Sequence, residues 1–224
     1  MSDPPVTVIR APSGEEADIR RRVREVDPAS LGPDRVIAVP GHAASLTRML
    51  ADPRVSDPIY DLPRPITEDS VRAWIEATAV QQGRGEAVLV LSLDEDGEVA
   101  GYSRFSVWPD RSSAEIAGAT RADRQNRGQG TTGAARSFGW MFEVLGVRLI
   151  GLTAAPDNVR SARVIEAAGF RPMGERDSRR PDGTLRRSLY WEMTVEEWRS
   201  AHPGAGTDAP SWASSQAFRS SPPA

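Results

Sequence analysis

Three apolar segments joined by very short connections constrain the fold of this chain more than any other feature. Segment 86–93 is a short apolar run, and the Asp96-Gly97 pair that follows it is typical of a β-hairpin turn. Segment 98–108 continues as the partner strand, and segment 112–120 follows after a Pro-Asp turn. Because only a few residues separate these segments, neighbouring strands must run antiparallel. We therefore expect an antiparallel sheet in the middle of the chain.

Segments with helical periodicity flank these strands. Residues 14–27 and 67–79 place apolar side chains at near-helical spacing, and the second segment begins at a capping residue, Thr67. Further along we expect a helix over 134–145, a strand over 147–153, a helix over 158–169, a strand from 170, a hairpin around 181–183, a strand over 185–193 and a capped helix over 194–200. The pattern predicts an α/β protein whose mixed sheet is antiparallel first and crosses over through helices later.

Composition indicates one soluble domain. The chain has 224 residues, of which 39% are hydrophobic and 26% charged, as in globular proteins. Residues 201–224 are rich in Pro, Gly, Ala and Ser without periodicity, which predicts a disordered tail. We expect a flexible N-terminus over 1–7 and a single domain over 8–200.

Several functional classes conflict with the residue content. The net charge of −3 gives no reason to expect a nucleic-acid partner. No apolar run approaches the roughly 20 residues that cross a bilayer, so we expect no membrane association and a cytoplasmic location. The chain has no cysteine and only two distant histidines, so we expect no metal site. It also lacks lysine, which excludes lysine Schiff-base chemistry and a Walker-type phosphate loop.

A glycine-rich stretch, QNRGQGTTGAA at 125–135, indicates a phosphate-binding loop of one of two kinds. It contains G-x-G-x-x-G, but a dinucleotide-binding turn needs an apolar strand directly before its first glycine, and the preceding RADRQNR is polar. It also contains Q-x-x-G-x-G. Glycines 128 and 130 let a pyrophosphate approach the amides at the start of a helix, and Thr131 and Thr132 add hydroxyl donors. A flexible turn before a helix is the alternative.

The order of these segments resembles the GNAT superfamily of N-acetyltransferases. Residues 125–131 match its [RQ]-x-x-G-x-[GA] loop, and residues 158–170 resemble its N-x-x-[AS]-x-x-[LV]-x-x-x-x-G-F helix. Segments 52–77 and 188–198 are similar in style to the branch that contains ribosomal-protein N-terminal acetyltransferases (RimJ/RimL-type). The resemblance implies a single-domain GNAT-like α/β fold with a central mixed, mostly antiparallel sheet flanked by helices.

The resemblance also implies acetyl-CoA as co-substrate, in a splay between the strands at 112–120 and 147–153. The acetyl group would pass to a primary amine, on a small molecule or a protein N-terminus, by direct attack on the thioester. An amide in the stretch 119–122 would polarise the acetyl carbonyl. The implied acetyl-CoA-binding residues are Ala122, Gln125, Asn126, Arg127, Gly128, Gln129, Gly130, Thr131, Thr132, Asn158 and Ser161.

Three residues are candidates for proton transfer. Glu115 lies on the face of its strand opposite Ile116 and is the candidate general base; a solvent-facing glutamate or an ion pair is the alternative. Many family members carry a tyrosine where this chain has Ile165, which leaves Ser161 and Tyr190 as candidate acids. A helix cap and an ordinary sheet residue are their alternatives. The missing tyrosine keeps open a second function, a non-catalytic acyl-CoA-binding sensor or interaction module; a homodimer is also left open.

Other side chains are weaker candidates on the acceptor side. Aromatic residues that could line an acceptor pocket are equally explained by core packing: Trp74, Tyr102 and Trp108. Four acidic residues give a weak indication of a pocket for a cationic acceptor: Asp57, Asp61, Glu68 and Asp69. Arginines cluster around the late hairpin, where interspersed acidic residues favour a self-compensating surface.

Overall fold

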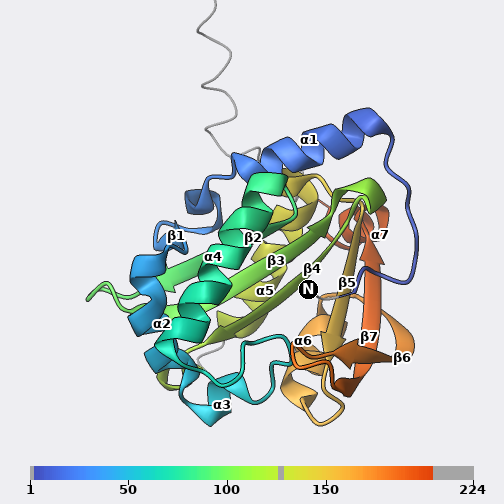
Figure 1. The fold of residues 1–224 in the computed structure, drawn as a ribbon. Helices are drawn as coiled ribbons and strands as arrows, with labels where there is room; N and C mark the ends of the chain where they lie inside the picture. The colour runs from blue at the N-terminus through green and yellow to red at the C-terminus, as the bar shows by residue number, and fades with distance from the viewer. Residues whose placement is uncertain (1–2, 126–128, 204–224) are drawn as a thin grey trace, which may run out of the picture.

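A seven-stranded sheet forms the centre of the part of the chain that the computed structural model describes, residues 3–125 and 129–203. Only the backbone of residues 129–132 is described. The strands are β1 Arg35–Ile37, β2 Ala87–Leu93, β3 Val99–Trp108, β4 Ser113–Thr120, β5 Leu149–Ala154, β6 Arg171–Arg179 and β7 Leu185–Thr194. Their order across the sheet is β1-β2-β3-β4-β5-β7-β6 (Figure 1).

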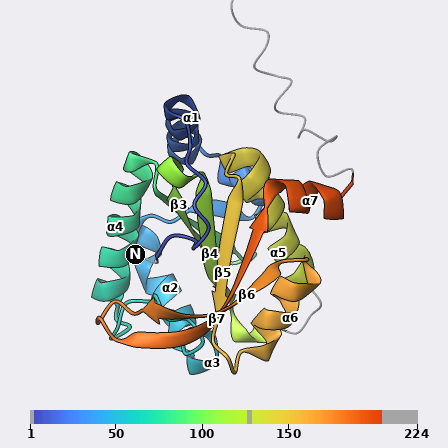
Figure 2. The same ribbon diagram turned by 90° about the vertical axis from the view of Figure 1, so that its right-hand side faces the viewer.

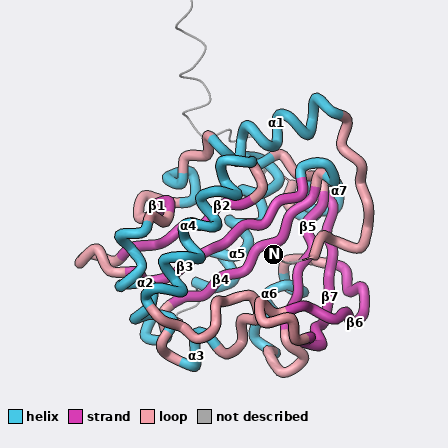
Figure 3. The backbone as a smooth tube through the Cα atoms, in the orientation of Figure 1, coloured by secondary structure: helices cyan, strands magenta, loops and turns pink. Residues whose placement is uncertain are grey.

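Helices cover both faces of this sheet. They are α1 Ser13–Arg24, α2 Ala43–Leu50, α3 Pro53–Ser56, α4 Glu68–Arg84, α5 Gln129–Trp140, α6 Val159–Ala167 and α7 Val195–Ala201, and α5 continues in a π-helical turn, Met141–Leu145. α2 and α4 lie in front of the strands and α5 behind them (Figure 3). Turned by 90°, the molecule shows three layers, with α4 and α6 on opposite sides of the sheet (Figure 2). The expected α/β fold with a mixed, mostly antiparallel sheet is confirmed.

Strand β2 shows why the apolar run at 86–93 forms this fold. Its alternate side chains enter two different cores: Val88 and Val90 pack with the residues of α5 and β5, and Leu89 and Leu91 pack with those of α2 and α4. All four are at most 2% exposed. A strand that buries both faces must be apolar at every position rather than at alternate ones.

One strand pair differs from the others in direction and length. β4 and β5 run parallel, and their register contains only Ser113 opposite Leu149 and Ala114 opposite Ile150. β4 nevertheless pairs with β3 up to Thr120 opposite Gly101, and β5 pairs with β7 up to Ala154 opposite Leu189. After a short parallel start, the two strands therefore diverge while each keeps its antiparallel neighbour (Figure 1).

The expected strands and the main helices are present with boundary shifts of a few residues, as in β5, expected over 147–153 and found over 149–154. No sequence pattern predicted β1, which has three residues, α2, which has eight residues, or α3, a single turn. Elements this short carry too few residues for a periodic pattern. The residue bounds expected for the domain stay a prediction.

Two kinds of feature are absent from residues 3–125 and 129–203. None of the helices there is long and apolar enough to span a membrane. No group of three or more histidine, aspartate or glutamate side chains in these ranges is arranged to hold a metal ion.

The turn from α4 into β2 depends on one glycine. Gly85 ends α4 in the left-handed conformation (φ 76°), and its N–H donates to the carbonyls of Gln81 and Gln82. A Cβ at this position would lie 2.6 Å from the Cα of Arg20 on α1. Gly85 therefore lets α1 and α4 approach each other at the edge of the sheet.

We expect Gly85→Ala to lower the free energy of unfolding by about 1–3 kcal/mol, because the substitution adds both backbone strain and a clash with Arg20. Thermal or denaturant unfolding measures this loss. Gly83→Ala is the matched control in the same helix: it meets no atom within 4 Å and should stabilise by about 0.5–1 kcal/mol. Equal effects of the two substitutions would contradict the assignment.

Candidate active site

A cavity of about 610 Å³ opens where β4 and β5 diverge. Residues 115–120 of β4 line one side, and Leu152, Thr153 and Ala154 of β5 line the other. Residues of α5 and α6 close it behind the sheet, and the segment around Tyr60 and Tyr102 of β3 border it in front. The cavity therefore passes through the sheet and connects its two faces.

The edge of β4 presents backbone groups to this cavity. Arg121 N–H donates to the carbonyl of Ala100 on β3 (2.8 Å), so by strand alternation Ile116, Gly118 and Thr120 direct their N–H and C=O groups toward the β5 side. The register with β5 ends at Ala114. Gln125 Nε2 donates to the Thr120 carbonyl (2.8 Å). The amides of Ile116 and Gly118 are therefore well placed to bind an extended ligand.

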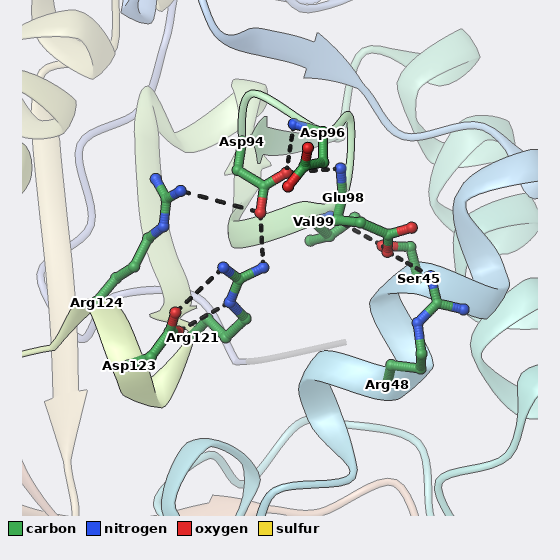
Figure 4. A network of polar contacts seen from close by, with 9 residues as sticks. All are labelled: Ser45, Arg48, Asp94, Asp96, Glu98, Val99, Arg121, Asp123 and Arg124. Atoms are coloured by element: carbon green, nitrogen blue, oxygen red, sulfur yellow. Dashed lines mark hydrogen bonds and ion pairs between the residues drawn. The ribbon is translucent and has the colours of Figure 1, made fainter.

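An ion-pair network holds the segment that follows β4. Arg121 donates to Asp94 in the β2–β3 turn (2.8 Å) and to Asp123 (2.8 Å), and Arg124 lies 3.9 Å from Asp94 (Figure 4). The Asp94 side chain is 7% exposed and also accepts a hydrogen bond from Glu98 N–H (2.9 Å). The hydrogen bond from Arg121 lowers the pKa of Asp94, which keeps it ionised. The network fixes the direction in which the chain enters the glycine-rich loop.

The described part of the predicted acetyl-CoA site comes together at one end of the cavity. Gln125, Asn158 and Ser161 all line it. Asn158 caps α6 by accepting from Ser161 N–H (3.1 Å), and Gln125 accepts from Arg160 (2.8 Å). Gln125 thus joins the end of β4 to the start of α6 across the diverging strands.

Some predicted binding residues lie elsewhere or outside the description. Asn126, Arg127 and Gly128 are outside the described residues. For Gln129, Gly130, Thr131 and Thr132 the structure describes only the first turn of α5, so the loop does lead into a helix. Ala122 lies in a single 3-10 turn and packs against the α2–α4 core instead of lining the cavity.

Three arginines that the sequence analysis did not single out also line this end of the cavity: Arg124, Arg136 and Arg160. They flank the glycine-rich loop and the first turn of α6. Their signal in the sequence is weak, because every basic residue of the chain is arginine and none stands out by type. They give the α5–α6 end of the cavity a positive character.

Glu115 lies at the point where the strands separate. Its side chain, 8% exposed, accepts a hydrogen bond from Thr153 Oγ1 on β5 (3.2 Å). It borders both the main cavity and a small recess lined by Pro5, Gly151 and Tyr190. The alternative of a solvent-facing glutamate does not describe this buried position at the cavity.

Tyr190 holds the N-terminal segment against the sheet. Its hydroxyl donates to Glu192 and accepts from Val6 N–H (3.0 Å). Glu192, 0% exposed, also accepts from Thr7 N–H (2.9 Å). Burial, with a further contribution from Glu192, raises the pKa of Tyr190. The hydroxyl is therefore committed to an anchoring network, and residues 3–7 lie in front of β5 (Figure 1). The flexibility expected for residues 1–7 stays a prediction.

The front end of the cavity is lined by polar side chains from several elements. Asp61 and Tyr60 come from the segment after α3, Tyr102 from β3 and Arg186 from β7. Arg186 donates to the Pro58 carbonyl (2.9 Å), and its guanidinium lies 4.6 Å from the Tyr60 ring centroid. The β6–β7 hairpin thus reaches the segment after α3.

The remaining weak candidates do not gather here. Trp74 packs edge-on against Tyr102 (5.6 Å between ring centroids), as core packing predicts. Trp108 and the exposed acidic residues Asp57, Glu68 and Asp69 are not among the described residues that line the cavity. Of the four acidic candidates, Asp61 alone lines it.

Fold and site define an α/β protein that can hold a thin, extended ligand between two diverging strands. Residues 36–171 match the family of the acetyltransferase (GNAT) domain. The chain therefore belongs to the GNAT acetyltransferase family, which confirms the expected N-acetyltransferase class and acetyl-CoA as co-substrate. A comparison with curated protein sequences finds no match.

Several solved structures share this fold. The ribosomal-protein-S5-alanine acetyltransferase of Vibrio fischeri is 15% identical, with a TM-score of 0.61 over 73% of this chain and 93% of its own. Mycobacterium smegmatis RimJ, in complex with CoA-disulfide, is 22% identical, with a TM-score of 0.60 over 73% and 82%. AAC(6')-Ib in complex with ribostamycin and coenzyme A is 19% identical, with a TM-score of 0.61 over 75% and 96%. At these identities the likeness is one of fold.

We expect Glu192→Gln to destabilise the protein by about 1–3 kcal/mol near neutral pH. The Glu192 carboxylate accepts hydrogen bonds from Thr7 N–H, the Thr7 hydroxyl and the Tyr190 hydroxyl, and an amide with one acceptor oxygen cannot accept all three in the same geometry. The pKa of Glu192 is lowered in the folded protein by these hydrogen bonds, which outweigh the effect of burial. Its contribution is therefore present above the ordinary glutamate pKa of about 4.3 and is lost as pH falls through the lower folded value.

Unfolding free energies measured across this pH range test the prediction. The variant should show a shallower loss of stability on acidification than the wild type. Glu196→Gln, an exposed change on α7, is the control and should leave both the stability and its pH dependence nearly unchanged. A Glu192→Gln profile parallel to the wild type would contradict the proposed anchoring role.

Proposed function

We propose that this chain binds acetyl-CoA with its pantetheine arm between the diverging strands and transfers the acetyl group to a primary amine that enters from the α2–α4 face. The observation that carries this proposal is the short β4–β5 register, which leaves the edge of β4 at Ile116 and Gly118 facing a cavity. An extended ligand with amide groups can occupy the place of a missing strand neighbour.

The residues of the cavity fit this ligand. Small side chains leave room beside the β4 edge and the first turns of α5: Ala117, Gly118, Ala119, Gly133 and Ala134. Arginines at the α5–α6 end match the charge of phosphate groups, and the N-terminus of α5 adds partial positive charge. The loop residues 126–128 stay predicted phosphate ligands.

Acetyl-CoA supplies an acyl group activated as a thioester, and this chain's residues supply orientation and proton transfer. We assign Glu115 as the base that removes a proton from the attacking amine, directly or through water, because it lies buried where the two strands part. The amine nitrogen bonds to the carbonyl carbon, the carbon–sulfur bond breaks, and the thiolate takes up a proton. Backbone N–H groups at the β4 edge would stabilise negative charge on the carbonyl oxygen.

The proton for the thiolate has fewer candidate donors. Ser161 lines the cavity in the first turn of α6, and its hydroxyl is the side chain we propose for this role. We assign Tyr190 to anchoring, because its hydroxyl is engaged by Glu192 and Val6. Ile165, 5% exposed, lines the cavity without a hydroxyl. That apolar surface is the one feature that favours the alternative, a non-catalytic acyl-CoA-binding sensor.

The acceptor is an amine on a small molecule or a protein N-terminus. Proteins that share the fold include one of each kind: a ribosomal-protein-S5-alanine acetyltransferase, and AAC(6')-Ib, whose structure contains ribostamycin. A cytoplasmic location and a homodimer stay predictions.

We expect acetyl-CoA to raise the melting temperature of the protein, since a ligand at 100 times its dissociation constant stabilises by about 2.7 kcal/mol. Gly128→Glu should abolish this shift by placing a side chain and a negative charge in the predicted pyrophosphate loop, and NAD should produce no shift. Differential scanning fluorimetry measures all three. A shift with NAD, or an unchanged shift in the variant, would contradict the interpretation of the loop.

We expect Glu115→Gln to lower kcat for amine acetylation by about a hundredfold or more, because the amide cannot accept the proton. The thermal shift with acetyl-CoA should be retained, since Glu115 makes no predicted contact with the phosphates. CoA release in the presence of a panel of primary amines measures the rate. Thr153→Val, which removes a hydrogen-bond donor to Glu115, is the control and should lower kcat less. Unchanged turnover in Glu115→Gln would remove Glu115 from the mechanism.

A further inference from the structure

Two buried polar atoms at the front end of the cavity have no hydrogen-bond partner among the described residues: Asp61 Oδ1 and the hydroxyl of Tyr102. Tyr102 is 3% exposed and the Asp61 side chain 14% exposed, and both residues line the cavity. Leaving such groups without a partner is costly, and most buried polar atoms in proteins have one. The described part of the chain therefore leaves hydrogen-bonding capacity unused at both atoms.

The neighbouring arginines do not supply the missing donor. Arg104 lies 4.0 Å from Asp61 Oδ2, and its guanidinium donates to Ser106 (2.6 Å) and to Gln81 (2.9 Å). Arg186 donates to the Pro58 carbonyl (2.9 Å) and to Ser188 (3.1 Å). Both cations offset the charge of Asp61 at longer range, but among the described residues no group donates a hydrogen bond to Oδ1.

We propose that Asp61 and Tyr102 form a subsite for a second amino group of the acceptor, bound as an ammonium ion. The acceptors of this enzyme would then be diamines or oligoamines, with one amine beside Glu115 and another at Asp61. The proposal rests on the proposed function, because it concerns the acceptor end of the same cavity.

The two carboxylates of the cavity suit different protonation states of an amine. The amine that attacks must be neutral, and Glu115 lies at the strand divergence where it would lose its proton. Asp61 lies on the front segment away from that divergence, so an amine there stays charged. An ammonium group donates to the carboxylate oxygen and to the tyrosine hydroxyl together, and such charge-assisted hydrogen bonds are strong.

A purely apolar acceptor group does not fit this position. It would leave both atoms unpaired, whereas an ammonium group can donate hydrogen bonds to them. Burial also raises the pKa of Asp61, so the carboxyl gains most from a ligand that brings positive charge.

Titration calorimetry on the CoA-saturated protein tests the subsite without turnover. The probes are short α,ω-diamines, from ethylenediamine to hexamethylenediamine, and the corresponding monoamines. We expect the best diamine to bind at least about tenfold tighter than its monoamine, as a hydrogen bond to a charged group predicts. Asp61→Asn should reduce this preference to within about twofold, and Tyr102→Phe should weaken it by about fivefold.

Two variants distinguish loss of the subsite from loss of the folded structure. Asp57→Asn changes an exposed aspartate of the same segment and should keep the preference. Tyr102→Phe removes one hydroxyl and leaves the ring that packs on Trp74, so it tests the subsite even if Asp61→Asn unfolds. Equal binding of diamines and monoamines by the wild type would overturn the proposal and mean that water fills the site. A preference that is undiminished in folded Asp61→Asn or in Tyr102→Phe would also overturn it.

The subsite and the proposed function fail in different ways. Calorimetric preference for diamines without CoA release from acetyl-CoA would support the subsite and contradict the enzyme mechanism. Acetylation of monoamines and diamines with equal kcat/KM, together with equal binding, would support the mechanism and overturn the subsite.

Discussion

The short parallel register between β4 and β5 is the constraint on which the rest of the site depends. A sheet can lose one pairing without losing a strand only if each strand keeps its other neighbour, and here β3 and β7 hold β4 and β5 along their lengths. The two cores on opposite faces hold the outer strands in place. The divergence is therefore stable, and it turns backbone groups that would pair within a sheet into groups that can bind a ligand.

Three arginines lie at one end of the cavity and two carboxylates lie toward the other, as acetyl transfer from an anionic donor to an amine requires. Arg124, Arg136 and Arg160 lie at the end formed by α5 and α6, where an anionic donor molecule would place its phosphates. Glu115 and Asp61 lie toward the front, where an amine would enter. The order follows from topology, because the helices behind the sheet start next to the glycine-rich loop while the front is built from β3, the segment after α3 and the β6–β7 hairpin.

The sequence predicts those parts of the fold that depend on neighbouring residues. The hairpin turn at Asp96-Gly97 and the alternation in β4 predict the antiparallel sheet and the face on which Glu115 lies. The pairing of Tyr190 with Val6, which are 184 positions apart, has no local signal. Asp61 likewise looks like any other aspartate of an acidic segment, because the charged residues beside it, Arg104 and Arg186, come from distant strands.

The N-terminal segment shows how the wall of such a site can be completed by a distant part of the chain. α2 and α4 cover the front of β2, β3 and β4, and residues 3–7 cover the front of β5 and β7 instead (Figure 1). Gly151 allows this close packing, since a Cβ there would meet Tyr190 Oη at 2.9 Å and the Pro5 ring at 3.0 Å. Residues 3–7 cover these two strands as an extended segment. A helix in the same place, about 10 Å wide, would block the approach to Glu115 from the front.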